Sequence, residues 1–278
     1  MKKLFAFVIA SATMLALAAP ASADTYIDLQ SAGLSGNDGA VFFIQGDNGK
    51  SAGTGVFPAF NRIQANNNEE GYSTSPNILD NTNDDTHNFA IQKKLLGVFT
   101  CPAGSTTCAP GAQYYEFHLD INEAGGGNEW LSLDDVRLFW STQDNLATEP
   151  FPSPATQVYN MTDTLHILMN FQVESGSGKD DMTMLIPVAL LAGAGQNDFI
   201  YLYSSFGAIT NCTGQGSTAG DDAKCVAGAD YTSSDGFEEW NFLAGPGVII
   251  VPDGGSTLGL LGLGMLTLGY VRRRFGKN

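Results

Sequence analysis

Carboxylates are the most numerous side chains in this chain that could carry chemistry. Its 278 residues include 29 Asp and Glu, several of them adjacent, as at 134–135, 180–181 and 238–239. A glycoside hydrolase needs two carboxylates that face each other across a cleft and have separated pKa values. Adjacency in sequence does not establish such a pair, and with this many acids adjacent pairs are expected by chance. A secreted glycoside hydrolase is therefore the third hypothesis for function.

Calcium binding is a second chemistry open to these acids. Asp38, Asp47 and Asp120 each lie in a short segment with further Asn, Asp, Glu or Gly residues, and Ca²⁺ takes oxygen ligands from such segments. None of the three matches the EF-hand loop, and Asx-turns between strands explain the same composition. The sequence indicates no other cofactor, so calcium is the one candidate and these aspartates are its candidate ligands.

A glycine-rich segment at 175–180 has the composition of a phosphate-binding loop without its pattern. The pattern needs Gly where Val173 stands, and Ser or Thr where Asp180 stands. We predict instead that Ser-Gly-Ser-Gly-Lys-Asp forms a hairpin turn between strands over 165–173 and 182–190.

The remaining reactive side chains do not form a recognisable catalytic set. His87, His118 and His166 are scattered, and the sequence contains no Gly-x-Ser-x-Gly elbow and no His-Glu-x-x-His motif. Three Trp and nine Tyr residues would either stack on sugar rings or fill a sandwich core. We therefore infer no catalysis, and a carbohydrate- or calcium-binding surface module is the second hypothesis.

Four cysteines, an even number, predict disulfides in an exported protein. Three pairings are possible. We favour the local pairs Cys101–Cys108 and Cys212–Cys225, because each flanks a loop rich in small and polar residues that a bridge would staple. A zinc site is disfavoured because the spacings contain no Cys-x-x-Cys pair.

Short β-rich runs separated by Gly, Asn and Asp are the elements that must position these side chains. Over 115–121 apolar residues alternate with polar ones, which is the period of a half-buried antiparallel strand. The fold class predicted is all-β, with an antiparallel β-sandwich of jelly-roll type as the ectodomain. The nine expected strands are 40–45, 55–64, 95–100, 113–121, 131–140, 165–173, 182–190, 199–206 and 238–243.

Two polar stretches interrupt the strand pattern. Residues 66–88 are rich in Asn and Asp and predict a long exposed loop. Residues 143–157 contain three prolines and predict a connector. Strand runs continue on both sides without a change in composition, so we predict one ectodomain rather than two.

The N-terminus predicts a signal peptide over residues 1–23. Lys2 and Lys3 form a basic n-region, 4–19 is an apolar h-region, and Ala-Ser-Ala at 21–23 is a cleavage site for signal peptidase. Export then uses the Sec translocon, and cleavage leaves Asp24 at the new N-terminus. The residues that define the cut are Ala21, Ala23 and Asp24.

The last thirty-one residues, 248–278, have the three parts of a sorting signal. Residues 254–271 carry no charge and are just long enough to cross a bilayer, which needs about 20 helical residues. The basic tail 272–278 follows, and Arg272, Arg273 and Arg274 act as a stop-transfer that stays in the cytoplasm. A turn-forming motif, Val-Pro-Asp-Gly-Gly-Ser-Thr at 251–257, precedes the span.

This tail resembles the PEP-CTERM class of bacterial sorting signals, in the VPDSG-type variant. Its motif residues are Val251, Pro252, Asp253, Gly254 and Gly255. The resemblance implies recognition by an exosortase-type membrane transpeptidase, removal of the tail, and delivery to the cell surface or extracellular matrix. A plain C-terminal anchor is the alternative.

The ectodomain is similar to an uncharacterised β-rich class attached to such tails. The similarity covers most of 39–240 and implies location and architecture without an activity. The segments that carry it are 53–64, 115–123, 131–139, 175–182, 201–207 and 235–240.

Charge limits the partners of the ectodomain, 24–247. It keeps seven of the 13 basic residues and 28 of the 29 acidic ones, so its formal charge is about −21. Such a surface repels nucleic acid and anionic lipid, and it suits a hydrated matrix. The leading hypothesis is therefore a non-enzymatic, exported surface or matrix protein, anchored briefly by its tail, with exopolysaccharide as a further partner.

Overall fold

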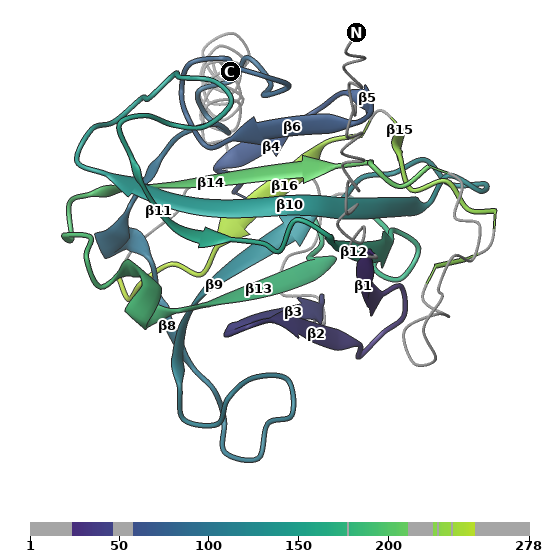
Figure 1. The fold of residues 1–278 in the computed structure, drawn as a ribbon, viewed down its shortest axis with the longest axis horizontal. Coiled ribbons are helices and arrows are strands. Elements are labelled where there is room, and N and C mark those ends of the chain that lie inside the picture. Colours follow the sequence, from purple (N-terminus) through teal and green to yellow (C-terminus); the bar gives the residue numbers. More distant parts are fainter. Residues whose placement is uncertain are drawn as a thin grey trace, which may run out of the picture.

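Two β-sheets lie face to face in the computed structural model, which describes residues 24–46, 58–176, 178–210, 225–226, 228–234 and 236–247 (Figure 1). In sheet A the strand order is β1 (Thr25–Leu29), β12 (Leu165–Asn170), β10 (Trp130–Ser141), β14 (Phe199–Phe206) and β6 (Glu69–Tyr72), with β11 (Thr156–Asn160) beside β10 and β7 (Ile91–Gln92) beside β14. In sheet B the order is β2 (Ser35–Asp38), β3 (Val41–Gln45), β13 (Met182–Pro187), β9 (Gln113–Asp120), β16 (Glu238–Phe242) and β4 (Asn61–Ile63), with β8 (Val98–Thr100) beside β9.

Smaller elements complete the fold. A two-stranded ribbon pairs β5 (Asn66–Asn67) with β15 (Ser233–Ser234), and the two short 3-10 helices are η1 (Lys93–Leu95) and η2 (Val188–Leu191). All strand pairs are antiparallel except β1 with β12. The predicted all-β sandwich is confirmed.

The core lies between the sheets and follows the alternation of the sequence. On β9, Tyr115, Phe117 and Leu119 point inward, and they meet the inward side chains of β10 and β14 from sheet A. Because successive side chains of a strand point to opposite faces, the acids and the histidine between them face outward. The predicted period-two pattern of β9 is therefore correct.

A bulge shifts this alternation within β10. In its pairing with β14 the register changes between Leu133 and Asp135. Leu131 and Leu133 point into the core before the bulge, and Val136 and Leu138 do so after it. An extra residue in one strand displaces the following side chains by one position, which leaves Asp134 and its neighbour outside the core.

Three expectations about the connections are wrong. Residues 175–180 do not form a hairpin turn, because β12 and β13 lie in different sheets and the chain crosses between them here. Residues 66–88 are not one exposed loop: they include β6, and Asn81 and Asn88 are buried.

The buried Asn81 side chain explains why the stretch is ordered. The Asn81 amide donates to the side-chain oxygens of Asn61 and Asn88, each at 2.8 Å, so the polar side chains of this stretch form buried hydrogen bonds rather than facing water.

The third wrong expectation is the extent of the connector 143–157, because its last two residues already belong to β11.

A disulfide joins Cys101 and Cys108, as predicted. Cys225 is also disulfide-bonded, and its predicted partner Cys212 lies outside the described residues, as do the signal peptide, Asp47, the span 254–271 and the sorting motif. Within the ranges given above, no helix has the length and apolarity needed to cross a membrane.

Candidate functional site

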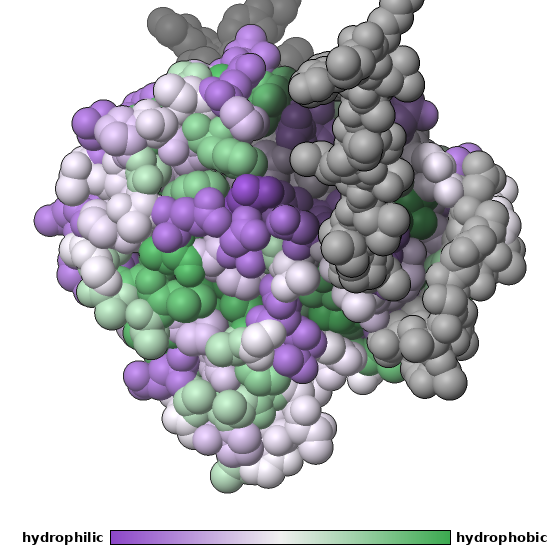
Figure 2. Space-filling view, viewed as in Figure 1, coloured by the Kyte–Doolittle hydropathy of each residue, from purple (hydrophilic) through white to green (hydrophobic). Residues whose placement is uncertain are grey.

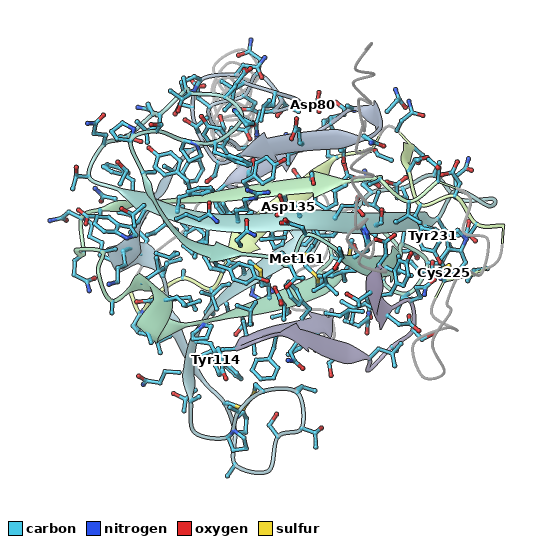
Figure 3. All side chains as sticks on the ribbon, viewed as in Figure 1. Asp80, Tyr114, Asp135, Met161, Cys225 and Tyr231 are labelled. Atoms are coloured by element: carbon cyan, nitrogen blue, oxygen red, sulfur yellow. A yellow bond between two sulfur atoms is a disulfide. The ribbon has the colours of Figure 1, made fainter. Side chains whose placement is uncertain are left out.

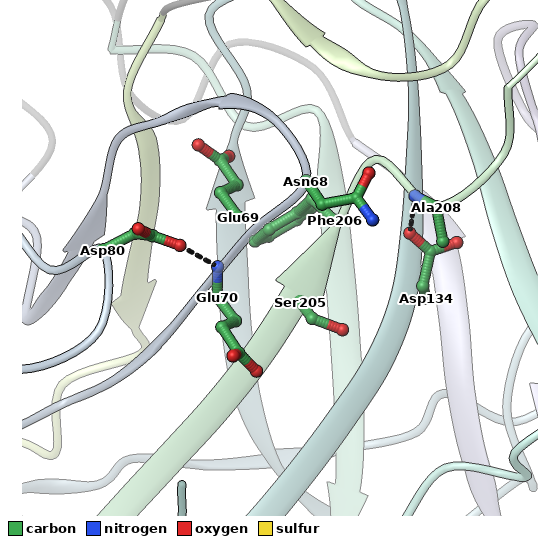
Figure 4. A pocket seen from close by; sticks show the side chains of 8 residues that line it. All are labelled: Asn68, Glu69, Glu70, Asp80, Asp134, Ser205, Phe206 and Ala208. Atoms are coloured by element: carbon green, nitrogen blue, oxygen red, sulfur yellow. Dashed lines mark hydrogen bonds between the residues drawn. The ribbon is translucent and has the colours of Figure 1, made fainter. Parts of the chain in front are cut away.

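An acidic pocket opens on the outer face of sheet A, beside the bulge of β10 (Figure 4). Its volume is about 300 Å³, at the lower end of what ligand pockets usually offer. Four of the eight lining residues are acids, and none is Lys or Arg. The lining residues are Asn68, Glu69, Glu70, Asp80, Asp134, Ser205, Phe206 and Ala208.

The backbone register of three strands places the acids on one face. Ser205 of β14 lies opposite Glu70 of β6 on one side and Asp135 of β10 on the other. Glu70 and Asp134 consequently lie on either side of Ser205, as Figure 4 shows. The pocket is thus built on strands, with the loop residue Asp80 closing one side.

Asp134 is fixed by the protein at both carboxylate oxygens. Oδ1 lies 2.7 Å from Nδ1 of His166, and Oδ2 accepts hydrogen bonds from the Ala208 amide at 2.6 Å and from the Ser132 hydroxyl at 3.0 Å. These contacts fix the orientation of the Asp134 carboxylate and occupy most of its lone pairs. Asp134 therefore has little capacity left to accept a proton from a substrate.

Glu70 and Asp80 are linked through the backbone. Asp80 Oδ2 accepts a hydrogen bond from the Glu70 amide at 2.9 Å, and the Glu70 carboxylate accepts one from the Tyr203 hydroxyl. Burial, and then the Glu70 carboxylate, raise the pKa of Tyr203, so this hydroxyl keeps its proton and remains a donor.

Arg137 forms an ion pair with Asp135, the acid next to the pocket. Arg137 Nε donates to Asp135 Oδ2 at 2.7 Å, and its guanidinium lies 4.3 Å from the centre of the Phe151 ring. Burial raises the pKa of Asp135, while the Arg137 hydrogen bond lowers it in part. The pocket itself stays acidic, so it favours cations or hydrogen-bond donors and repels anions.

A group of three buried glutamates, one of which (Glu69) also lines the pocket, was not predicted from the sequence. Glu69, Glu123 and Glu238 are nearly inaccessible to solvent, and Glu238 is 0% exposed. Glu69 accepts a hydrogen bond from the Ala65 amide at 2.7 Å, and Glu123 accepts one from the Ser234 amide at 2.9 Å. The Glu238 carboxyl group lies against that of Glu69 and near the Asn122 backbone amide.

Protonation of Glu238 explains how its carboxyl group can lie buried beside that of Glu69. Burial and the adjacent Glu69 carboxylate raise the pKa of Glu238 well above its usual range, so the protonated Glu238 can donate to Glu69. Burial also raises the pKa of Glu123, to about 7. One feature of the sequence pointed to this group. Glu238 lies two and four residues before Trp240 and Phe242 on the same strand, so it faces the same side as these two core residues.

The described calcium candidates serve structural roles. Asp38 accepts hydrogen bonds from the Tyr159 hydroxyl at 3.0 Å and from the amide and hydroxyl of Thr162 at 3.0 and 2.9 Å. Asp120 lies at the end of β9 rather than on a turn, is 1% exposed, and accepts a hydrogen bond from the Gly178 amide at 2.6 Å. In the part of the chain that the structure describes, no three His, Cys, Asp or Glu residues are arranged to hold a metal ion.

Each histidine lies beside a carboxylate. His87 contacts Asp84, His118 Nδ1 lies 2.6 Å from Asp180, and His166 contacts Asp134. His118 and His166 are both 9% exposed and sit on strands.

Comparison with known proteins finds one match, at the C-terminus. Residues 251–275 match the model of the VPDSG-CTERM motif, a PEP-CTERM-type sorting variant. No curated protein and no solved structure matches the chain. The motif marks an exported protein with a membrane anchor at its C-terminus, of the kind that exosortase, a membrane enzyme, generally processes.

Proposed function

We propose that this chain is a non-enzymatic protein of the cell surface or extracellular matrix, which an exosortase-type transpeptidase cleaves from its membrane anchor. The observation that carries the proposal is the VPDSG-CTERM motif at 251–275. Within this match, Val-Pro-Asp at 251–253 precedes the uncharged span 254–271 and the basic cluster Arg272–Arg274, an order that holds the tail in the membrane with the cluster on the cytoplasmic side.

The charge partition supports delivery to an aqueous exterior. Loss of the signal peptide 1–23 and the tail 248–278 removes six of the 13 basic residues and only one acid. The remaining domain has a formal charge of about −21, which favours solubility and hydration over adhesion to anionic lipid. Exopolysaccharide is the matrix partner that we propose.

The geometry of the acidic pocket favours binding over catalysis. A general acid–base pair needs carboxyl groups that are free to exchange protons with a substrate. Both oxygens of Asp134 accept hydrogen bonds from the protein. Asp80 accepts one from the Glu70 amide, and the Glu70 carboxylate accepts one from the Tyr203 hydroxyl. A binding module that takes carbohydrate or calcium is therefore the second candidate function, and a glycoside hydrolase is less well supported.

Expression in hosts with and without the exosortase-type enzyme tests the proposal. In the host that has the enzyme, we expect the chain to leave the membrane fraction in a shortened form. Replacement of Val251, Pro252 and Asp253 by alanine should leave it full-length and membrane-bound. Thr267→Ala, within the span, is the matched control and should be processed normally. Equal processing in both hosts would refute the proposal.

A further inference from the structure

A second pocket lies between sheet B and the disulfide loop. This loop follows β8 and projects from the molecule (Figure 1), with Tyr114 at its base (Figure 3). The pocket has a volume of about 280 Å³, which suits a ligand of one or two sugar rings rather than a long chain segment. Its lining residues are Ile44, Phe99, Pro102, Ser105, Thr107, Cys108, Glu116, Thr183 and Leu185.

The floor of this pocket is apolar. Ile44, Phe99 and Leu185 come from three strands of sheet B, and they belong to a hydrophobic cluster with Tyr114 and the disulfide. Ile44 and Phe99 are only partly buried by the protein itself. A ligand with an apolar face would complete their burial, and each Å² of apolar surface so covered is worth roughly 25 cal/mol.

One end of the pocket carries an oriented carboxylate. Glu116 Oε1 lies 3.2 Å from His118 Nε2, and His118 Nδ1 lies 2.6 Å from Asp180 Oδ2. Asp180 also accepts a hydrogen bond from the Thr183 hydroxyl at 3.2 Å. Burial acts to lower the pKa of His118, but its hydrogen bonds to Asp180 and Glu116 outweigh this and raise it to about 9.

One imidazolium lies between two carboxylates, so His118 offsets part of the charge of Glu116 before any ligand arrives. Since the imidazolium of His118 already pairs with Glu116, a cationic ligand would gain little from this carboxylate. An anionic ligand would be repelled by an ectodomain of formal charge about −21. The pocket consequently selects neutral molecules that can donate hydrogen bonds to Glu116.

Two hydroxyl groups of the disulfide loop also line the pocket. Ser105 and Thr107 lie on the disulfide loop, with their hydroxyl oxygens 3.1 Å apart. The Cys101–Cys108 bridge restricts this loop, which lowers the entropy lost on binding. Figure 2 shows the projecting part of the surface mostly in pale colours, of intermediate hydropathy.

We propose that this pocket binds a neutral pyranose unit of a polysaccharide. The C–H face of the sugar ring packs on Phe99, and its hydroxyls donate to Glu116 and exchange hydrogen bonds with Thr183, Ser105 and Thr107. The proposal rests on the proposed function only for the source of the sugar, which is the matrix outside the cell.

Titration calorimetry on the full-length chain tests this site. The chain is held in a detergent without a sugar headgroup, so that the detergent does not compete. The probes are the methyl glycosides of glucose, galactose and mannose, with glucuronic acid and glucosamine as charged comparisons. We expect at least one neutral glycoside to bind, and to bind at least ten-fold more tightly than either charged sugar.

Two variants locate the binding. Phe99→Ala and Thr107→Val should each weaken the neutral glycoside at least ten-fold, while Val98→Ala, on the exposed neighbour of Phe99, should bind like the wild type. An unchanged thermal midpoint verifies that each variant is folded, and Thr107→Val alters only a loop side chain. Absence of binding by all three glycosides, preference for a charged sugar, or full affinity in both pocket variants would overturn the proposal. Because purified protein is used, none of these results depends on exosortase processing.

Discussion

At the scale of single residues, the buried carboxyl groups make the stability of the fold depend on pH. Burial raises the pKa of Glu123 to about 7 and that of Asp120 to about 8. Each is a carboxyl whose pKa in the folded chain exceeds its value in the unfolded chain, so folding favours the protonated form. The stability these groups contribute is present below the unfolded pKa, about 4, and is lost as pH rises through the folded pKa.

The protein should therefore become less stable between about pH 5 and pH 9. His118 acts in the same direction, because its folded pKa of about 9 also exceeds the unfolded value. Thermal unfolding followed at several pH values should show a falling midpoint. For Glu123 alone the change corresponds to roughly 3 kcal/mol at most. A midpoint that stays flat or rises over this range would contradict the buried state of these acids.

Glu123→Gln should flatten the pH dependence between about pH 5 and pH 7. The amide fills the same volume and never ionises, so the variant avoids the cost of burying a charge. The exposed Glu149 provides the matched control, since Glu149→Gln should leave the pH profile unchanged. The measurement is the difference in unfolding free energy at pH 5 and pH 8.

Asp38→Ala should destabilise the fold by about 2 kcal/mol, because it leaves the Tyr159 hydroxyl and the Thr162 amide without their acceptor. Denaturant unfolding measures this loss. Asp163→Ala is the control, as this exposed acid accepts a long hydrogen bond from the Asn160 amide, at 3.5 Å. Equal stability of the two variants would show that Asp38 does not tether the strands.

Among the elements, the disulfide loop depends most on a single bond. The Cys101–Cys108 bridge closes a loop with a sequence separation of 7 residues, which corresponds to about 2 kcal/mol of stability. A variant with both cysteines replaced by serine should lose this amount in denaturant unfolding and should bind sugar more weakly. The double variant is preferable to reduction, which would also affect the bond made by Cys225. Unchanged stability and affinity would contradict the role given to this loop.

The strands that were predictable from sequence are those with many apolar residues and with turn-forming residues near their ends. β14 was predicted with its observed bounds, 199–206, and β9 within one residue. β2 and β6 were not predicted, because they are short and mostly polar and depend on tertiary partners. β1 was also missed, although its Ile27 and Leu29 alternate with other residues and enter the core. Periodicity within a run also carries no information on which sheet it joins, so the crossing between β12 and β13 was missed.

The candidate sites were predictable to a smaller extent. A local disulfide follows from spacing, and Cys101–Cys108 is present. The acidic pocket could not be foreseen, because it depends on β6, β10 and β14 lying side by side and on a bulge in β10. The same holds for Glu69 and Glu238, which are 169 residues apart in sequence and meet only across the folded chain.

At the scale of the whole molecule, an acidic β-sandwich lies between two terminal segments of different composition. The tail concentrates four of the 13 basic residues in its last seven positions, while the described domain holds the pockets. The central claim is that this tail serves transit and is absent from the mature protein.

Mass spectrometry of the protein recovered from its native envelope tests this claim most directly. We predict that the C-terminal peptide ends within or near the motif 251–255 and lacks Arg272–Arg274. A mature chain that still contains Arg272–Arg274 would contradict the account and identify the tail as a permanent anchor.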